Sequence, residues 1–414
     1  MSLVRVVVTG VGMITPVGLD AKSSWESFVA GRSGAGPVTR FDTSAFEVRF
    51  ACQVNDFNPA QHLDFKEARR MARFTQFAVV AAKEALDDAR LTIGPELAER
   101  VGVIIGSGIG GVEAFVEAVV TNLEKGPRRV SPFAVPMLMA NGAAGQIAIA
   151  HGAKGPNFAL VSACATGSNA LGEAWETIRR GDADVMIAGG SEAPIIPMAF
   201  AALANMGALS KRNDDPQGAS RPFDATRDGF VSGEGAGVLI LERLEHALAR
   251  RAPIYGEMVG YGATADAFHI TAPAEGGEGA ARAMELALRK AGLSPEEVDY
   301  INAHGTSTPL NDAAETQAIK KALGSHAYKV PISSTKSMIG HLMGAAGAIE
   351  AIVTLLTIKY GVIHPTINYQ HPDPVCDLDY VPNKARQARV RVALSNSFGF
   401  GGHNACVAFR QYEG

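Results

Sequence analysis

Short runs of β-branched residues alternate with alanine-rich stretches along the chain, and this alternation constrains the fold more than any other feature. Runs such as Val101–Ile105 and Val185–Ala188 are apolar at nearly every position, as in strands that are buried on both faces. Stretches such as Gly167–Arg180 space their apolar residues three and four apart, which is the period of a helix. Buried strands separated by helices predict a layered α/β architecture.

The same criteria place the individual elements. We predict strands at Val4–Val8, Val101–Ile105, Phe158–Val161, Val185–Ala188, Gly237–Glu242, Val298–Ala303, Val330–Ser333, Val390–Ser395 and Ala405–Phe409. We predict helices at Arg69–Ala89, Gly167–Arg180, Gly277–Ala291, Asp312–Ala322 and Ala345–Tyr360.

Two segments of the chain resemble each other. Phe158–Cys164 runs into a helix rich in glycine and alanine, and Val330–Lys336 leads through His341 into a similar helix that begins near Gly344. Each segment predicts a strand, then a turn with reactive side chains, then a helix of small residues. This similarity predicts two duplicated halves that meet around one site, with a seam near residues 250–255.

Composition excludes several classes of protein. Hydrophobic residues make up 47% of the chain and charged residues 19%, which excludes disorder and coiled coil. The net charge of −4 offers no footprint for nucleic acid. The four cysteines form no CxxC pair, so we expect reduced thiols in a cytoplasmic protein. Glycines break the apolar run Val4–Val17 and no longer run occurs, so we expect neither a signal peptide nor a membrane span.

Cys164 is a candidate nucleophile. It lies where a predicted strand ends and a helix begins, and there the helix dipole and free backbone N–H groups favour a thiolate and an oxyanion. The neighbours Ala163, Ala165 and Gly167 leave room for a substrate. A buried structural cysteine is the alternative that these residues leave open.

Two histidines occur in turns of the same kind. His304 directly follows an apolar strand, and His341 lies in a turn rich in glycine and serine. Each alone could be a core histidine, but such turns gather at the carboxyl ends of strands, where sites form in α/β proteins. Two imidazole N–H donors aimed at one thioester oxygen would stabilise the enolate that malonate leaves on losing CO₂.

The trio Cys164, His304 and His341, together with Ser333–His341 and the glycine-rich segment Asn396–Gly402, resembles the β-ketoacyl-acyl-carrier-protein synthase II group of elongating condensing enzymes. The resemblance covers nearly the whole chain. It implies the thiolase-like fold, a five-layer α-β-α-β-α sandwich of two pseudo-symmetric halves, which we place at residues 1–253 and 254–414. It also implies a homodimer and a decarboxylating condensation in type II fatty-acid elongation.

The resemblance further implies roles for individual residues. Cys164 would carry the acyl chain, His304 and His341 would hold the enolate, and Phe400 would be a mobile gate whose N–H completes the oxyanion hole with that of Cys164. Lys336 would act with a supporting network of charges at Glu350, Glu315 and Asp312. Substrate-binding positions would be Thr306, Thr308, Ile109 and Thr271. Positions that hold a monovalent cation with a structural role in some relatives are Asn302, Glu350, Ser395 and Asn396.

No cofactor of the enzyme's own is implied, because 4′-phosphopantetheine arrives on the acyl carrier protein, loaded with either an acyl or a malonyl group. Four arginines are candidates for docking that acidic partner, although charged runs are more often solvated surface: Arg69, Arg70, Arg128 and Arg129. The segment Gly106–Gly111 matches GxGxxG, but no acidic strand end follows at the spacing of a dinucleotide site.

Three of the four alternative functions would require residues that differ from those of this chain. A polyketide ketosynthase shares the same trio and is the nearest alternative. A thiolase would have a second catalytic cysteine near the C-terminus, where this chain has Gly399–Asn404, and Cys406 falls in a predicted strand. Initiating synthases have asparagine in place of the second histidine, and a non-catalytic subunit would lack the nucleophile.

Overall fold

Ten strands pair into one continuous sheet that contains the same five-strand order twice. The structure, a computed structural model, describes residues 4–414. One group runs in the order β5-β4-β6-β7-β1 and the other in the order β10-β9-β13-β14-β8. The first group comprises β1 (Val6–Ile14), β4 (Val101–Gly106), β5 (Asn157–Phe158), β6 (Val185–Glu192) and β7 (Gly235–Arg243). The second comprises β8 (Gly256–Ala265), β9 (Tyr300–Asn302), β10 (Ile332–Ser333), β13 (Val392–Gly399) and β14 (His403–Arg410).

The two groups match strand for strand. Counted along the chain, the first strand of each group pairs antiparallel with the fifth, and the fifth pairs antiparallel with the fourth. The remaining pairs are parallel. A short antiparallel pairing between β1 and β8 joins them. The repeat that the sequence predicts is therefore present. The boundary between residues 253 and 254 stays a prediction, because the halves share this sheet.

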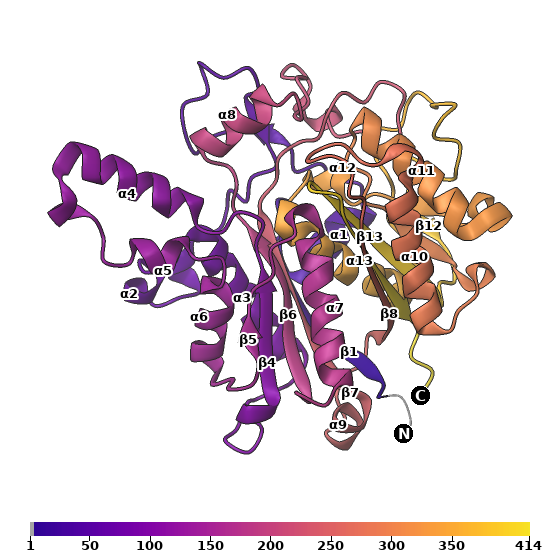
Figure 1. The fold of residues 1–414 in the computed structure, drawn as a ribbon, viewed down its shortest axis with the longest axis horizontal. Coiled ribbons are helices and arrows are strands. Elements are labelled where there is room, and N and C mark those ends of the chain that lie inside the picture. Colours follow the sequence, from indigo (N-terminus) through magenta and orange to yellow (C-terminus); the bar gives the residue numbers. More distant parts are fainter. Residues whose placement is uncertain (1–3) are drawn as a thin grey trace.

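Helices lie on both sides of the strands and between them (Figure 1). α3 (Arg73–Asp88) and α6 (Gly142–His151) cover the first group, and α10 (Glu278–Ala291) and α11 (Pro309–Leu323) lie beyond the second. α7 (Thr166–Arg179) and α13 (Ala346–Tyr360) pack against strands of both groups, so they form a central layer. The predicted five-layer α-β-α-β-α sandwich is confirmed.

The largest buried cluster surrounds this central layer. The segment Met343–Tyr360, which contains α13, is apolar and long enough to cross a membrane, and 83% of it is buried inside the protein. Its apolar length is therefore accounted for by contacts with both strand groups.

Glycines explain the main differences between the predicted and observed strands. β1 continues to Ile14 although glycines interrupt its apolar run, because α3 lies directly on it: a Cβ on Gly12 would be 2.1 Å from the Ala81 carbonyl oxygen. The prediction missed β8 for the same reason. A Cβ on its Gly262 would be 1.9 Å from the Ala283 carbonyl oxygen of α10. The two halves thus use the same close strand–helix contact.

The other differences concern bounds and short elements. The predicted strand Phe158–Val161 is shorter, at Asn157–Phe158. The predicted helix Arg69–Ala89 corresponds to α3 alone, which begins four residues later, and the short α2 (Phe65–Ala68) before it was not predicted. Helices that the prediction missed are α1 (Ala21–Val29), α4 (Val112–Lys125), α5 (Ala134–Leu138), α6, α8 (Pro197–Asn205), α9 (Leu244–Ala249) and α12 (Lys336–Ile339). The remaining short strands are β2 (Gly36–Pro37), β3 (Phe50–Ala51), β11 (Val362–Ile363) and β12 (Arg386–Gln387).

Candidate active site

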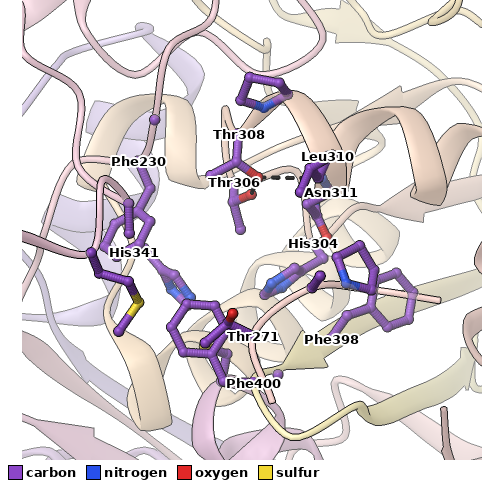
Figure 2. A pocket seen from close by; sticks show the side chains of 18 of the residues that line it. Phe230, Thr271, His304, Thr306, Thr308, Leu310, Asn311, His341, Phe398 and Phe400 are labelled. Atoms are coloured by element: carbon purple, nitrogen blue, oxygen red, sulfur yellow. Dashed lines mark hydrogen bonds between the residues drawn. The ribbon is translucent and has the colours of Figure 1, made fainter. Parts of the chain in front are cut away.

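A cavity of about 400 Å³ opens where the two halves meet, and its lining includes Cys164, His304 and His341. His304 and His341 face the open space from neighbouring walls (Figure 2). Their ring centroids are 5.3 Å apart and their planes are nearly perpendicular, at 85°. The structure therefore brings together the three side chains that the sequence places in three separate turns.

Cys164 lies in the 3₁₀ turn Ala163–Ala165, immediately before α7. The turn needs a left-handed backbone at Ala163, whose φ is 49°. Burial raises the pKa of the Cys164 thiol to about 11, while the charge of Lys336 and the backbone N–H groups of Phe400 and Cys164 lower it. Burial thus opposes the thiolate that the sequence predicts, while the backbone N–H groups of Phe400 and Cys164 both act on Sγ and favour it.

The two histidines present the same ring nitrogen to the cavity. Lys336 Nζ donates to His304 Nδ1 at 3.3 Å, and the Met343 N–H donates to His341 Nδ1 at 3.2 Å. Because each Nδ1 accepts, each neutral ring has its proton on Nε2. Burial and the charge of Lys336 lower the pKa of both histidines well below the usual value. Both rings are thus neutral N–H donors.

The predicted network of supporting charges divides into two parts. Lys336 forms an ion pair with Glu350, and both side chains are buried. Glu315 accepts from the backbone N–H groups of His304 and Gly305, at 2.8 and 2.7 Å. Burial raises the pKa values of Glu350 and Glu315 to about 7. These contacts fix both the ring and the backbone of His304.

Asp312 belongs to a different cluster. Its carboxylate accepts from the Phe223 N–H at 2.8 Å and lies 3.7 Å from the Arg227 guanidinium. It also accepts from the Ser307 N–H at 3.2 Å. Asp312 therefore supports the site through the loop after β9, which contains His304, and its charge acts on the neighbouring Glu315. Its role in the network around Lys336 stays a prediction.

Most of the predicted substrate-binding residues line the cavity. Thr306 and Thr308 share a hydrogen bond of 2.9 Å between their hydroxyls, and Thr271 and Phe400 lie on the cavity wall. Ile109 is different: it is absent from the lining of this cavity, and its side chain is 40% exposed. The role of Ile109 in lining an acyl pocket therefore stays a prediction.

Two aromatic residues near the histidines were not predicted from the sequence. Phe230 packs edge-on against His341 with ring centroids 5.3 Å apart, and Phe398 packs against His304 at 5.6 Å. Both line the cavity. Sequence position could have identified both: Phe230 directly precedes the glycine-rich run Val231–Gly237, and Phe398 lies inside the glycine-rich segment Asn396–Gly402.

The four predicted cation ligands lie behind this site and retain unused oxygens. Among the described residues, no hydrogen-bond partner reaches Glu350 Oε2, Ser395 Oγ or Asn396 Oδ1, although all three are buried. Asn302 donates from Nδ2 to Thr335 Oγ1 at 3.1 Å, which leaves its own oxygen facing only a weak contact of 3.5 Å. No group of three histidine, cysteine or acidic residues suited to a transition metal occurs among the described residues.

Comparisons with known proteins agree with this geometry. Residues 4–247 match the family model described as "Beta-ketoacyl synthase, N-terminal domain", and residues 255–370 match its C-terminal domain. The chain is 57% identical over 409 residues to "3-oxoacyl-[acyl-carrier-protein] synthase 2" of Synechocystis sp., covering 99% of this chain and 98% of the relative.

Solved structures share the fold over nearly the full length. A β-ketoacyl synthase from Burkholderia phymatum superposes with a TM-score of 0.91 at 38% identity, covering 99% of this chain and 100% of the other. A type II polyketide ketosynthase, solved in complex with its acyl-carrier protein, superposes with a TM-score of 0.92 at 38% identity and covers both chains completely.

Proposed function

The chain belongs to the β-ketoacyl synthase family, and from this premise we propose that it extends an acyl chain on Cys164 by decarboxylating malonyl-acyl-carrier protein. The observation that carries the proposal is the shared cavity, in which one thiol faces two neutral imidazole N–H donors. The product is β-ketoacyl-acyl-carrier protein. The reaction is the condensing step of type II fatty-acid elongation.

The first step moves the acyl group onto the protein. Cys164 Sγ attacks the thioester carbonyl of acyl-carrier protein, and the N–H groups of Cys164 and Phe400 hold the oxyanion. The bond from carbonyl carbon to carrier sulfur then breaks. The proton lost from the Cys164 thiol balances the proton gained by the departing carrier thiol, so this exchange needs no net acid or base.

The second step generates the carbon nucleophile. The carboxylate of malonyl-carrier leaves as CO₂, and the electron pair of the broken C–C bond becomes an enolate. Its oxygen accepts from Nε2–H of His304 and of His341, which are fixed in that tautomer by their Nδ1 contacts. Removing one such donor in other enzymes costs about 10²- to 10³-fold in rate.

The third step forms the new carbon–carbon bond. The enolate carbon attacks the acyl carbonyl on Cys164, and the same two backbone N–H groups hold the second oxyanion. The bond to Sγ breaks, and the Cys164 thiolate takes up one proton from solvent, which balances the negative charge that the malonyl carboxylate brought in. Bond making and breaking balance throughout without a change of oxidation state at the protein.

Turnover with malonyl-carrier and a ladder of acyl-carriers of increasing length tests this proposal. We expect a product two carbons longer than each accepted acyl group, detected by mass on the carrier. Absence of a β-ketoacyl product at every length, from folded protein, would contradict the proposed condensation.

A polyketide ketosynthase is the second candidate, because a structure of that class superposes over the whole chain. The 57% identity to a 3-oxoacyl-[acyl-carrier-protein] synthase 2, against 38% to the polyketide enzyme, favours fatty-acid elongation. A β-ketoacyl-carrier substrate distinguishes the two. We expect no extension of it, whereas repeated extension would favour the polyketide reading.

The carrier would dock through basic side chains and deliver its pantetheine arm along Thr306 and Thr308, which line the cavity. The four predicted docking arginines, Arg69, Arg70, Arg128 and Arg129, are all exposed. Among the described residues, none of them forms an ion pair with an acidic side chain of this chain. Replacing each by alanine should raise KM for the carrier and leave kcat unchanged; an unchanged KM would remove that arginine from the docking surface.

A second copy of this chain is the proposed partner for the exposed edge of the sheet. β5 is an edge strand whose two residues are exposed. Around it lie exposed apolar side chains on α4, α5 and α6, the helices on the left of Figure 1. An apolar face beside an open strand edge is suited to pairing between copies. The exposed side chains include Phe115, Leu123, Val135, Ile149 and Val161.

Sedimentation of the wild type and of Ile149→Glu tests the homodimer. Ile149 is 77% exposed in the single chain, so a charge there leaves the folded monomer intact but would be buried in the proposed interface. We expect a dimer for the wild type and a monomer for the variant. A monomeric wild type would contradict the proposal.

A monovalent cation fits the four oxygen-bearing residues Asn302, Glu350, Ser395 and Asn396, since three of their oxygens are buried without partners. A cation there would offset the carboxylate of Glu350 and brace the strands behind His304. Thermal unfolding in Na⁺, K⁺ and tetramethylammonium at equal ionic strength tests it. We expect a higher Tm with one alkali ion; equal Tm values in all three would remove the site.

A further inference from the structure

Glu192 and Gly399 occupy the same place in the two halves. β6 and β13 are both eight residues long, each is the fourth strand of its half, and these two residues end them. Gly399 lies against the nucleophile turn, where a Cβ would be 2.9 Å from Cys164 N. Glu192 lies against the matching turn of the second half, where its Oε2 accepts from the Gly344 N–H at 2.9 Å.

The Glu192 carboxylate is fully buried and accepts four hydrogen bonds. Ser107 Oγ and the Ile109 N–H donate to Oε1 at 2.7 and 3.2 Å. The Gly108 N–H donates to Oε2 at 2.6 Å, beside the Gly344 N–H. Three of the four partners are backbone N–H groups, which can only donate, and two of them meet Oε2, so the site suits a carboxylate that accepts on both oxygens. Burial opposes this by raising the pKa of Glu192, and the donors lower it.

One contact connects this carboxylate to His341, and a comparison of the two halves relates it to Cys164. Gly344, whose N–H it binds, directly follows Met343, whose N–H donates to His341 Nδ1. In the first half, the N–H that corresponds to that of Gly344 belongs to Cys164, which is assigned to the oxyanion. The Glu192 carboxylate thus occupies, in the second half, the position that a reacting oxyanion takes in the first.

We propose that Glu192 is a positioning residue for the decarboxylation step: its carboxylate fixes the Met343–Gly344 turn, and this turn holds His341 with Nε2–H directed at the enolate oxygen. The inference rests on the proposed function. It also accounts for the GxGxxG match, because the N–H groups of Gly108 and Ile109 that could otherwise bind a phosphate already donate to Glu192.

Glu192→Gln tests this with little change of shape. The amide would point an NH₂ group at N–H donors, so the turn must shift. We expect CO₂ release from malonyl-carrier to fall about 100-fold, the effect of a misplacement of roughly 1 Å. Acyl transfer to Cys164, measured by intact-protein mass, should stay near the wild-type rate. Equal losses in both steps would indicate general damage and overturn the proposal, as would unchanged CO₂ release.

Glu242→Gln is the matched control. Glu242 is equally buried and also lies on a central strand, but it accepts from Thr9 and Arg250 away from the cavity. Both chemical steps should proceed at wild-type rates in this variant. A selective loss of CO₂ release in Glu242→Gln as well would overturn the proposal, because any buried charge would then have the same effect.

Ser107→Ala keeps the test valid if Glu192→Gln does not fold. It removes one of the four donors and leaves the carboxylate, so CO₂ release should fall about fivefold, the equivalent of one hydrogen bond. No selective loss in a folded Ser107→Ala would overturn the inference. Wild-type protein that gives neither acyl-enzyme nor CO₂ would instead refute the proposed function itself.

Discussion

The two turns that begin the central helices have the same backbone and different chemistry. Each is a three-residue 3₁₀ turn, Ala163–Ala165 before α7 and Met343–Ala345 before α13. Each starts with a residue in the left-handed region, at φ 49° and 47°. The middle residue is Cys164 in one and Gly344 in the other. The fold thus provides the turn twice, and one side chain decides which copy can form a covalent bond.

A difference in length completes the contrast. Four residues separate Phe158 at the end of β5 from Ala163, whereas nine separate Ser333 at the end of β10 from Met343. The longer segment contains α12 and His341, with Lys336 at the start of α12. The first half therefore supplies the nucleophile, and the second supplies both of the groups that stabilise the enolate. The two halves thus share one scaffold, and the longer segment of the second half adds Lys336 and His341 to it.

Cys164→Ala gives the largest expected effect. Condensation should fall on the order of 10⁶-fold, as for loss of a nucleophile in other enzymes, because no atom is left to carry the acyl group. CO₂ release from malonyl-carrier should persist, since the histidines come from the other half. Intact-protein mass after incubation with acyl-carrier measures the first effect. An acyl adduct on this variant would mean that the nucleophile lies elsewhere.

His304→Ala and His341→Ala should show the opposite pattern, in which CO₂ release is lost and acyl transfer is retained. Each removes one neutral donor, so CO₂ release should fall about 10²- to 10³-fold while Cys164 still accepts an acyl group. The measurement is CO₂ release beside intact-protein mass on the same preparation. Wild-type CO₂ release in either variant would show that its ring does not hold the enolate.

Lys336→Met should lower both activity and stability. It leaves Glu350 buried without its cation, which should cost about 3 kcal/mol of unfolding free energy. Burial already raises the pKa of Glu350 to about 7 in the folded protein. A carboxyl whose pKa is higher when folded than when unfolded is least destabilising when protonated. The cost should therefore shrink as the pH falls from 8 to 5.5, in urea unfolding at both values. A cost that does not depend on pH would mean that Glu350 is not the group left unpaired.

Gly344→Ala should show the smallest effect and sharpens the comparison most directly. A Cβ there would lie 2.5 Å from Gly108 N and 2.8 Å from Glu192 Oε2, so we expect a loss of about 2 kcal/mol from overpacking. Gly36→Ala in β2 is the control, since nothing lies within 4 Å of the added carbon and β2 is outside both the cavity and the proposed interface. It should change stability by no more than about 0.5 kcal/mol. If Gly344→Ala were as stable as that control, the second turn would have the free space that we assign only to the first.

The layered fold and the trio were predictable because each rests on a local signal. Continuous apolar strands indicated burial on both faces, and Cys164, His304 and His341 each follow a strand end. β8 was missed because Gly260 and Gly262 give its sequence no strand propensity; their role is contact with α10, which no local pattern reveals.

Charge pairing was predictable only in part. The predicted ion pair between Lys336 and Glu350 is present. Asp312, in the first turn of α11, lies instead against Arg227, which belongs to a loop distant in sequence. Ile109 lies outside the cavity for a related reason: its backbone N–H is held by Glu192, a contact across 83 residues. Such contacts depend on tertiary packing, and motif spacing does not encode them.

The pairing of β1 has a consequence for how the chain is made. β1 is synthesised before the other strands of the sheet, yet Val6 pairs with Arg243 on one side and with Met258 on the other. The central helix α13, which fills the space between the strand groups, emerges later still. Contacts this distant in sequence close slowly, and the apolar faces they cover stay exposed to chaperones and to aggregation during translation. On the ribosome, β1 leaves the exit tunnel before the other strands of the sheet, yet it is the last strand of its half to acquire both of its neighbours.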